Sequence, residues 1–441
     1  MKRLLPLLLC AVLALFCATT AQAAGVSITL TASEYALHYA FDAGAQDPFV
    51  ILEYTTPAEK GWMMLYSEDG HFEGDVSLAY SGAGGKTSVA LTSARTTGSI
   101  GKASTTLPKA ADYQKPTGKS NVKVTDFVLT ETPEGFHYAF NAAGTDYMLL
   151  YWRSKEQTVT QPVYPDENGH YEGDVVSELT FARTQFTVQV KSGSGSMKKE
   201  ATVRKGYQAP EAPQRQEGRL SGVTVCIDAG HQENGRFVNE PIGPGLSGST
   251  SGKGGMAQGT KTNRRESIVC LEIGMLLRDE LLRQGTNVVM TREDQTTFHT
   301  NIERCEIAEA GGAQIMLRLH CNNSSNRSKR GIQVYGPLNS DYAKAVADAD
   351  TYREMGQKLL DAMKTRVGMT LANSTGMVRL NDNYVGNNWA KMMCFLVEMG
   401  YLSNPAEEYL LVTPVYQQWL AEGMADGVYE IAVARGWVQA Q

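Results

Sequence analysis

Residues 223–232 read VTVCIDAGHQ, and this stretch decides how the C-terminal half of the chain folds. Its first part, Val223–Ile227, has the β-branched, apolar character of a buried strand. The small pair Ala229-Gly230 then allows a sharp turn directly before His231. Open α/β sheets bind ligands beyond the carboxyl ends of their strands. His231 is therefore a candidate site residue, although a lone histidine in such a turn is more often simply solvated.

The sequence at 222–441 alternates strand-like and helix-like segments, which predicts an α/β catalytic domain with an open, mostly parallel twisted sheet flanked by helices. Two further apolar strands are expected, Gln314–His320 ending on a histidine and Met392–Glu398 ending on a glutamate. A helix expected over Arg264–Arg283 carries Glu266 in its first turn. The other expected elements are a strand at Thr286–Thr291, a helix at Ile302–Ala310, one long helix at Ser340–Val367, a strand at Gly376–Leu380, and a helical stretch at Ala406–Arg435 with a break near Pro414.

If these strands run parallel, their carboxyl ends lie at one edge of the sheet, beside the start of the helix. The residues brought together would be His231, His320, Glu266 and Glu398. Two imidazoles and one carboxylate form a catalytic zinc set that leaves a fourth position open to water. Such ligands suit zinc better than magnesium or calcium, which prefer oxygen. The remaining glutamate could then act as general base for a zinc-activated water.

The N-terminal half contains an internal repeat. His38–Phe41 recurs as His137–Phe140, and Gly70–Val76 recurs as Gly169–Val175, both at an offset of 99 residues. Short alternating runs between turn signals predict an antiparallel β-sandwich for each copy. The expected domain boundaries are 24–107 and 120–205 for the two tandem β-sandwich repeats, 206–221 for a linker, and 222–441 for the catalytic domain.

Four of the seven histidines occupy matched positions in the two copies, His38 with His137 and His71 with His170. A metal site in each copy is one interpretation of this pattern. However, no second type of ligand recurs with them at metal-binding spacing along the sequence. The pattern therefore favours a structural role for these four histidines.

The chain begins with a segment typical of an export signal. Lys2 and Arg3 precede the apolar run Leu4–Cys17, and Ala21-Gln22-Ala23 fits a small-x-small cleavage site, which predicts a signal peptide at 1–23. No stretch is apolar and long enough to span a bilayer. The net charge of −6 argues against nucleic acid as a partner. We expect an exported protein that acts outside the cytoplasm, in the extracellular space or the periplasm.

Cysteines are confined to the catalytic domain once the expected signal is removed. They are Cys226, Cys270, Cys305, Cys321 and Cys394. Their number is odd, none forms a CxxC pair, and most lie in apolar runs, where cysteine behaves as a small hydrophobic residue. The pattern favours buried thiols over a disulfide framework.

A series of motifs after residue 222 points to one known family. The motifs are Ile227–Gln232, Glu240–Gly245, Glu266 five residues before Leu271, Thr291–Glu293, Leu319–Asn322, Gly386–Trp389 and Val397–Pro405. With them, residues 222–435 resemble the zinc-dependent N-acetylmuramoyl-L-alanine amidases of the type 3 family. Many members have glycine in place of Gln232 and alanine in place of Cys321, and neither departure removes a ligand. The N-terminal repeats lie outside the resemblance.

The resemblance implies that His231, Glu266 and His320 bind Zn²⁺ and that Glu398 is the catalytic glutamate. It also implies a peptidoglycan hydrolase that cleaves the amide between the lactyl group of N-acetylmuramic acid and the L-alanine of the stem peptide. Glu398 would deprotonate the zinc-activated water and return the proton to the departing amine. The wall is therefore the expected partner, and the ligand of the repeats is left open.

Three further residues have expected roles around this centre. Arg318 shares a strand face with His320 and could bind a substrate carboxylate or oxyanion, or form a salt bridge at the end of the sheet. Asn322 is a second candidate for substrate binding. Asp228 could orient His231 as an outer partner or cap the turn.

Two other functions fit the same residues. One is a different exported zinc hydrolase, a peptidase or a deacetylase, although the helical HExxH pattern of many zinc peptidases is absent. The other is a non-catalytic wall-binding protein in which the repeats carry the function. Retention of all four candidate site residues argues against the second alternative.

Overall fold

The computed structural model describes most of the chain: residues 19–22, 26–34, 36–57, 60–78, 82–96, 98–111, 122–132, 135–145, 148–153, 158–176, 184–192, 196–205, 211–232, 238–250, 255–368 and 378–440. The chain divides into two compact units, 1–115 and 116–441. Of the expected signal peptide, only 19–22 belong to the described residues. Within the described parts of the chain, no helix is both long and apolar enough to cross a membrane.

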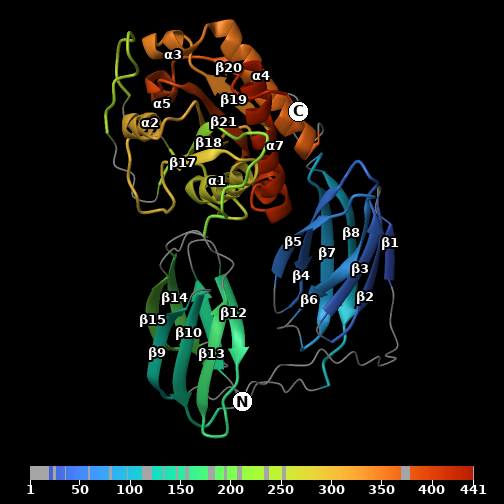
Figure 1. Ribbon diagram of the computed structural model, residues 1–441. Coiled ribbons are helices and arrows are strands. Elements are labelled where there is room, and N and C mark those ends of the chain that lie inside the picture. The colour runs from blue at the N-terminus through green and yellow to red at the C-terminus, as the bar shows by residue number, and fades with distance from the viewer. Residues whose placement is uncertain are drawn as a thin grey trace. The chain divides into compact units, whose positions relative to one another are not determined.

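The first unit consists of strands in two sheets (Figure 1). The strands are β1 (Thr19–Gln22), β2 (Ser27–Ala32), β3 (Ala36–Asp42), β4 (Phe49–Thr55), β5 (Lys60–Tyr66), β6 (His71–Ser77), β7 (Gly85–Ser93) and β8 (Ser99–Leu107). The sheet orders are β1-β2-β3-β6 and β5-β4-β7-β8, and the neighbouring strands within each sheet pair antiparallel. One core draws on both sheets, with Leu30 and Leu37 from the first packed with Leu52 and Leu91 from the second.

The second unit begins with strands that repeat this arrangement. They are β9 (Val124–Thr132), β10 (Gly135–Ala142), β11 (Met148–Arg153), β12 (Thr158–Val163), β13 (His170–Val176), β14 (Thr184–Lys191) and β15 (Met197–Lys205). Their sheet orders, β13-β10-β9 and β12-β11-β14-β15, match those of the first copy without a counterpart of β1. The shared core includes Phe136 from the first sheet against Trp152 and Phe186 from the second.

The rest of the second unit is an α/β domain around one six-stranded sheet. Its strands are β16 (Thr224–Ala229), β17 (Asn287–Met290), β18 (Ile315–Asn322), β19 (Gln333–Gly336), β20 (Val378–Leu380) and β21 (Met393–Tyr401), in the order β17-β16-β18-β21-β19-β20. The pairs β16–β17, β16–β18, β18–β21 and β19–β20 are parallel, and β19–β21 is antiparallel. The parallel run β16-β18-β21 therefore brings the carboxyl ends of three strands to one edge.

Helices pack on both faces of this sheet (Figure 1). They are α1 (Glu266–Arg283), α2 (Asn301–Ala310), α3 (Asp341–Val346), α4 (Ala349–Val367), α5 (Val385–Trp389), α6 (Glu407–Leu410) and α7 (Pro414–Ala434). Gly274 of α1 lies over Ile227 and Leu319 on one face. On the other face, Cys305 of α2 packs into a cluster with Cys226 and residues of β18 and β21. Alternate residues of β16 thus face opposite layers, as the pleat requires.

Two details differ from the expected elements. The prediction of one long helix at Ser340–Val367 is wrong, because the helical conformation is interrupted between α3 and α4. Ala347 is extended, with φ −165°, and the Asp348 side chain accepts the Thr351 N–H at 2.8 Å and so begins a new helix. The break expected near Pro414 is confirmed, with the proline at the start of α7. Sequence reasoning also missed α5 and β19.

The end of the expected linker is bound to the α/β domain. Gln216 N–H donates to the Leu282 carbonyl at 3.0 Å, and Leu220 N–H donates to the Gln284 carbonyl at 2.8 Å. This segment therefore lies against the C-terminal end of α1. The five cysteines of the domain are all free and buried, in agreement with the preference for thiols over disulfides.

Candidate metal centre

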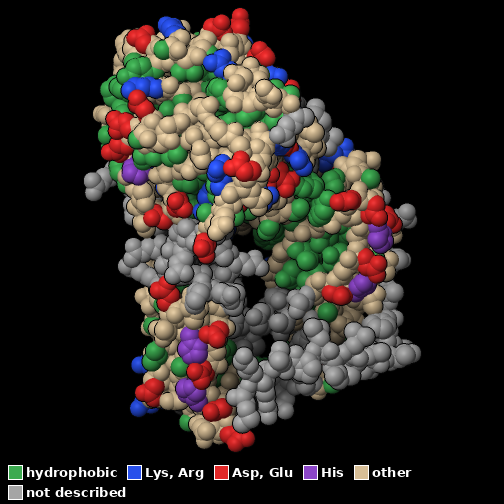
Figure 2. Space-filling view, in the orientation of Figure 1, with side chains coloured by type: hydrophobic (Ala, Val, Ile, Leu, Met, Phe, Trp, Pro, Cys, Tyr) green, Lys and Arg blue, Asp and Glu red, His purple; other side chains and the backbone are tan. Residues whose placement is uncertain are grey.

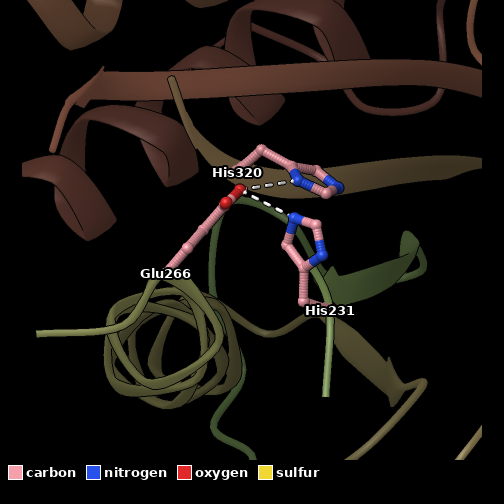
Figure 3. A group of neighbouring side chains, drawn as sticks. All are labelled: His231, Glu266 and His320. Carbon is pink, nitrogen blue, oxygen red and sulfur yellow. Dashed lines mark hydrogen bonds and ion pairs between the residues drawn. The ribbon is translucent and has the colours of Figure 1, made fainter. Parts of the chain in front are cut away.

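Three side chains lie close enough together to hold one metal ion. The ligand atoms of His231, Glu266 and His320 all lie within 4.8 Å of one another. His231 Nε2 is 3.0 Å from Glu266 Oε1, and His320 Nδ1 is 2.9 Å from the same oxygen. Figure 3 shows both imidazoles directed at the carboxylate that begins α1. Parallel strands β16 and β18 thus deliver the two histidines to one helix start, as the sequence predicts.

The turn after β16 is built by close backbone packing. His231 has φ 58°, a left-handed conformation that is uncommon outside glycine. A Cβ at Gly230 would lie 2.6 Å from the His320 ring, so this position requires glycine. The buried Arg292 side chain donates to the Ala229 carbonyl at 2.7 Å and to the Gly230 carbonyl at 2.9 Å. These contacts fix the direction in which His231 leaves the strand.

Glu266 is held at both carboxylate oxygens. Besides the two imidazoles, Oε1 accepts the Cys321 N–H at 3.0 Å, and Oε2 accepts the Ala257 N–H at 2.8 Å. Burial alone would raise the pKa of Glu266, but its contacts with His231 and His320 hold that pKa below the usual range. Burial lowers the pKa of His320, although the Glu266 contact opposes this. A carboxylate between neutral imidazoles is the donor set of a zinc-type site.

Glu398 is a fourth site residue with a different environment. It lies opposite His320 in the register of β18 and β21. Its Oε2 is buried and has no hydrogen-bond partner among the described residues. Burial and then the nearby Glu266 carboxylate raise the pKa of Glu398 well above its usual range. Glu398, Glu266 and the two histidines line one cavity of about 540 Å³, so Glu398 can exchange a proton with a molecule bound there.

Asp228 is the centre of a buried ion network behind the histidine turn. Its Oδ2 accepts Arg318 Nε at 2.9 Å, and its Oδ1 accepts Thr291 Oγ1 at 2.8 Å as well as Arg304. Burial would raise the pKa of Asp228, but the two guanidinium groups hold it far below the usual range. Arg304 also donates to the backbone carbonyl of His231 at 3.2 Å. Asp228 is thus connected to His231 through Arg304. The role expected for Asp228, to orient His231, stays a prediction.

The two residues expected to bind substrate both line the cavity. Arg318 is buried and engaged, because besides the Asp228 contact it donates to Asn301 Oδ1 at 2.7 Å. The structure thus contains the salt bridge that was the alternative for Arg318. Asn322 Nδ2 donates to Gln333 Oε1 at 3.2 Å. Binding of substrate by Arg318 and Asn322 stays a prediction.

Two residues that position the site were missed as functional candidates. Arg304 lies within the helix expected at Ile302–Ala310, and its spacing of three from Asn301 places both on one face of α2. Glu240 is buried and accepts the Asn301 N–H at 3.2 Å and the Ile302 N–H at 2.8 Å at the start of α2. It anchors the segment 238–250, which is flanked by residues 233–237 and 251–254 outside the described parts of the chain.

Comparison with known proteins places this geometry in a family. Residues 225–430 match the model of a family described as N-acetylmuramoyl-L-alanine amidase. The germination-specific N-acetylmuramoyl-L-alanine amidase of Bacillus subtilis is 26% identical over 231 residues, which cover 49% of this chain and 83% of that protein. The probable cell wall amidase LytH of Staphylococcus aureus is 26% identical over 218 residues, covering 48% of this chain and 60% of that protein.

Two solved structures are also similar to part of this chain, at lower identity. The N-acetylmuramoyl-L-alanine amidase of Clostridium difficile 630 is 23% identical, with a TM-score of 0.38, and the match covers 48% of this chain and 96% of that one. The N-acetylmuramyl-L-alanine amidase of Mycobacterium abscessus is 18% identical, with a TM-score of 0.43, and the match covers 48% and 99%. The family match carries the assignment: residues 225–430 of this chain are a domain of the N-acetylmuramoyl-L-alanine amidase family.

Proposed function

We propose that the protein hydrolyses peptidoglycan at the amide between the lactyl group of N-acetylmuramic acid and the L-alanine of the stem peptide. The family match and the names of both curated relatives support this reaction. The observation that carries it here is the set His231, Glu266 and His320 at metal-binding distance, with Glu398, whose buried Oε2 has no hydrogen-bond partner among the described residues, lining the same cavity. This combination supplies a cation site and a proton acceptor in one cavity.

The donor set fits Zn²⁺. His231 offers Nε2 and His320 offers Nδ1, and both nitrogens already point at the ionised Glu266 oxygen. Backbone N–H groups of Ala257 and Cys321 hold that carboxylate in place, which is the outer support that metal ligands generally have. A bound Zn²⁺ would polarise the substrate carbonyl and lower the pKa of water. Mixed nitrogen and oxygen donors favour it over Mg²⁺ and Ca²⁺.

Glu398 carries the proton transfers. Its free oxygen accepts a proton from the attacking water, and the resulting carboxylic acid then donates it to the nitrogen of the departing L-alanine. The buried position gives Glu398 a high proton affinity, which suits a group that must take up and release one proton per cycle. Arg318 and Asn322, at the wall of the same cavity, are positioned to contact substrate, Arg318 only through the N–H groups that Asp228 and Asn301 leave free.

The N-terminal segment supports export of the protein, with a signal peptide at residues 1–23. Cleavage after Ala23 would remove β1, which pairs with β2 at the edge of its sheet. The second copy forms the corresponding sheet from β9, β10 and β13 alone. After cleavage at this position, the first repeat would retain β2, β3 and β6, the same three-stranded sheet that the second repeat forms.

The N-terminal half comprises two tandem β-sandwich repeats that position the amidase domain on its substrate. The matched sheet orders and the single core in each copy support this description. The sheet of the amidase domain is correspondingly an open, mostly parallel one, with β19 as its antiparallel member. These assignments give the repeats a binding or spacing role outside the catalytic chemistry.

Product analysis tests the proposal and separates its alternatives. Full-length protein is incubated with purified peptidoglycan, with and without a chelator, and the products are identified by mass spectrometry. The amidase releases intact stem peptides with free L-alanine amino termini, the chelator abolishes this release, and added Zn²⁺ restores it. Shortened stems would identify a peptidase, and released acetate a deacetylase. No product, together with Zn²⁺ below one-tenth occupancy, would identify a non-catalytic wall-binding protein.

A further inference from the structure

Each N-terminal repeat carries a cluster of histidines and carboxylates on one exposed strand face. The first cluster consists of His38, Asp42, His71, Glu73 and Asp75, on β3 and β6. The second cluster consists of His137, Asn141, His170, Glu172 and Asp174, on β10 and β13. Figure 2 shows histidines flanked by acidic side chains on the surface of both repeats.

The strand register explains why these side chains meet. On β3 and β6, His38 is opposite Asp75, and Asp42 is opposite His71. The central pair is Ala40 with Glu73, so a methyl group faces the glutamate and leaves it room between the histidines. Residues two apart share a face, which puts the whole set on one side of the sheet.

The second copy has the same register. His137 is opposite Asp174, Asn141 is opposite His170, and Ala139 is opposite Glu172. A second ligand type therefore does recur with the histidines, in the form of one glutamate per copy. It is separated from His38 and His137 along the chain, and only strand pairing brings it beside them. Along the sequence only one histidine of each pair, His71 or His170, lies close to the glutamate, two residues before it.

In both copies the two histidines direct the same nitrogen at the glutamate. His38 Nε2 lies 3.3 Å from Glu73 Oε1, and His71 Nε2 lies 3.6 Å from Glu73 Oε2. The corresponding distances in the second copy, from His137 and His170 to Glu172, are 3.2 and 3.8 Å. In each repeat the two imidazole Nε2 atoms thus contact the same glutamate, one at each carboxylate oxygen.

The other ring nitrogens are held by oxygen acceptors. His38 Nδ1 lies 3.1 Å from Asp75 Oδ1, and His71 Nδ1 lies 2.7 Å from Asp42 Oδ1. A metal-binding histidine nearly always donates its second N–H in this way, which fixes the ring and leaves the first nitrogen free to bind the ion. The matching Nδ1 contacts of His137 with Asp174 and of His170 with Asn141 measure 2.9 and 2.7 Å.

The change from Asp42 to Asn141 separates two explanations of the clusters. If they were only ion pairs of protonated histidines, a neutral amide at this position would remove one charge partner. Asn141 nevertheless keeps its Oδ1 on His170 Nδ1 and donates its Nδ2 to Asp126 at 2.9 Å. Both copies therefore retain an oxygen acceptor that orients the ring, rather than a charge. Exposed ion pairs also contribute little to stability, so stability alone does not explain the arrangement.

We infer that each repeat binds one divalent cation of the Zn²⁺ type through two histidine Nε2 atoms and the intervening glutamate. In the first repeat the ligands are His38, His71 and Glu73, and in the second they are His137, His170 and Glu172. The two Nε2 atoms now contact different carboxylate oxygens, so closure on one ion requires rotation of the side chains. Their exposed fractions, 30% to 60%, leave them free to rotate. This inference is independent of the proposed catalysis.

Counting bound Zn²⁺ in the full-length chain tests the inference. Protein stripped of metal is dialysed against buffered Zn²⁺, and bound metal is measured by elemental analysis. We expect three ions per chain in the wild type, two in His71→Ala, and one in the double variant His71→Ala with His170→Ala. Glu73→Gln with Glu172→Gln should also lose two, and circular dichroism verifies that each variant is folded. His299→Ala, a histidine outside all three sets, keeps the wild-type count.

Metal binding by the repeats can be measured separately from metal binding at the amidase centre. His231→Ala removes a ligand of the amidase centre alone, so it should bind two ions if the repeats bind as inferred. The inference is overturned if the double histidine variant binds as many ions as the wild type, or only one fewer. A wild type that binds one ion, lost in His231→Ala, also overturns it and leaves the amidase proposal intact.

Discussion

The amidase centre and the first repeat cluster both contain two histidines and one glutamate, but in opposite surroundings. In both, one glutamate lies between two histidines. At the amidase centre the Glu266 side chain is 4% exposed and the histidines 16% to 23%, whereas in the first repeat Glu73 is 58% exposed and its histidines 37% to 50%. Residue identity alone therefore does not distinguish a catalytic site from a surface site.

Burial is what gives the amidase centre its chemistry. Withdrawal from water raises the pKa of both Glu266 and Glu398, but the contacts of Glu266 with His231 and His320 outweigh this and hold its pKa below the usual range, whereas that of Glu398 stays raised. The surface clusters have no counterpart of Glu398, because Asp42 and Asp75 are engaged with imidazole Nδ1 atoms. We expect the repeats to bind metal without turning over substrate.

Replacement of Glu398 should have the largest effect. Glu398→Gln keeps the size of the side chain but cannot accept a proton, so peptidoglycan hydrolysis should fall by about 10²–10⁴-fold, the range typical of a lost general base. Zn²⁺ bound at the amidase centre should stay near stoichiometric, because its three ligands are intact. Release of L-alanine termini and metal content are measured on the same preparation. His231→Ala should lose both, and wild-type activity in Glu398→Gln would exclude Glu398 as the base.

Removal of the buried Asp228 carboxylate should have the next largest effect, now on stability. Asp228→Asn leaves Arg304 and Arg318 buried without their common partner, which typically costs about 3–5 kcal/mol. The melting temperature of the amidase domain should fall by on the order of 10 °C in calorimetry.

The exposed carboxylate Asp75 provides the matched comparison. Asp75→Asn, measured without metal, should leave the melting profile unchanged, because a solvent-exposed ion pair contributes little. Equal shifts in Asp228→Asn and Asp75→Asn would contradict the distinction between buried and exposed carboxylates.

The sequence predicted the elements that end on His231, His320 and Glu398, because strand patterns and their end residues are local. Partners that lie far apart along the chain were not predictable in the same way. Arg304 reaches Asp228 only after α2 packs on β16, and Glu73 reaches His38 only through strand pairing. The break at Ala347 was not predicted, although aspartate at position 348 favours a helix N-cap over a helix interior.

Glu407 offers a test of burial through pH. Burial raises its pKa to about 7 from 4.5, although the backbone N–H groups of Tyr401 and Gly331 oppose this. The folded state therefore keeps the proton to higher pH than the unfolded state. Burial of Glu407 does not lower the free energy of unfolding below about pH 4.5, where the carboxyl is protonated in both states. As the pH rises toward 7, the free energy of unfolding falls. The full loss corresponds to about 3 kcal/mol.

Glu407→Gln should remove this part of the pH dependence. Chemical denaturation at intervals between pH 4.5 and 8 should give a smaller decline in unfolding free energy than in the wild type. The exposed Glu303 is the control with opposite sign, because contacts with Thr300 lower its pKa and its contribution to stability is lost as pH falls. Parallel pH curves for Glu407→Gln and the wild type would show that Glu407 titrates as an ordinary surface acid.

Replacement of Glu408, the neighbour of Glu407 on α6, should have the smallest effect. We expect it to change the Zn²⁺ affinity rather than the stability of the fold. It is fully buried, and its Oε2 accepts the Lys261 N–H at 2.8 Å and the Thr262 N–H at 3.1 Å. The same loop carries Ala257, whose N–H holds Glu266 Oε2. Glu408→Gln places an amide against these donors and loosens the loop. Zn²⁺ affinity at the amidase centre should fall by about tenfold. This is the lower end of the range observed when a residue that supports a metal ligand is replaced.

Competition with a chelator measures this loss, with the exposed Glu430→Gln on α7 as control. A loop that only supports the fold would lower the melting temperature and leave Zn²⁺ affinity unchanged, which would contradict a positioning role for Glu408. The contrasting result is a Zn²⁺ affinity that falls tenfold at the amidase centre and stays unchanged at the repeat sites. That result would show that the two kinds of site differ in the contacts that hold their ligand carboxylates. Glu266 depends on a chain of buried contacts from α6, whereas Glu73 depends only on its two paired strands.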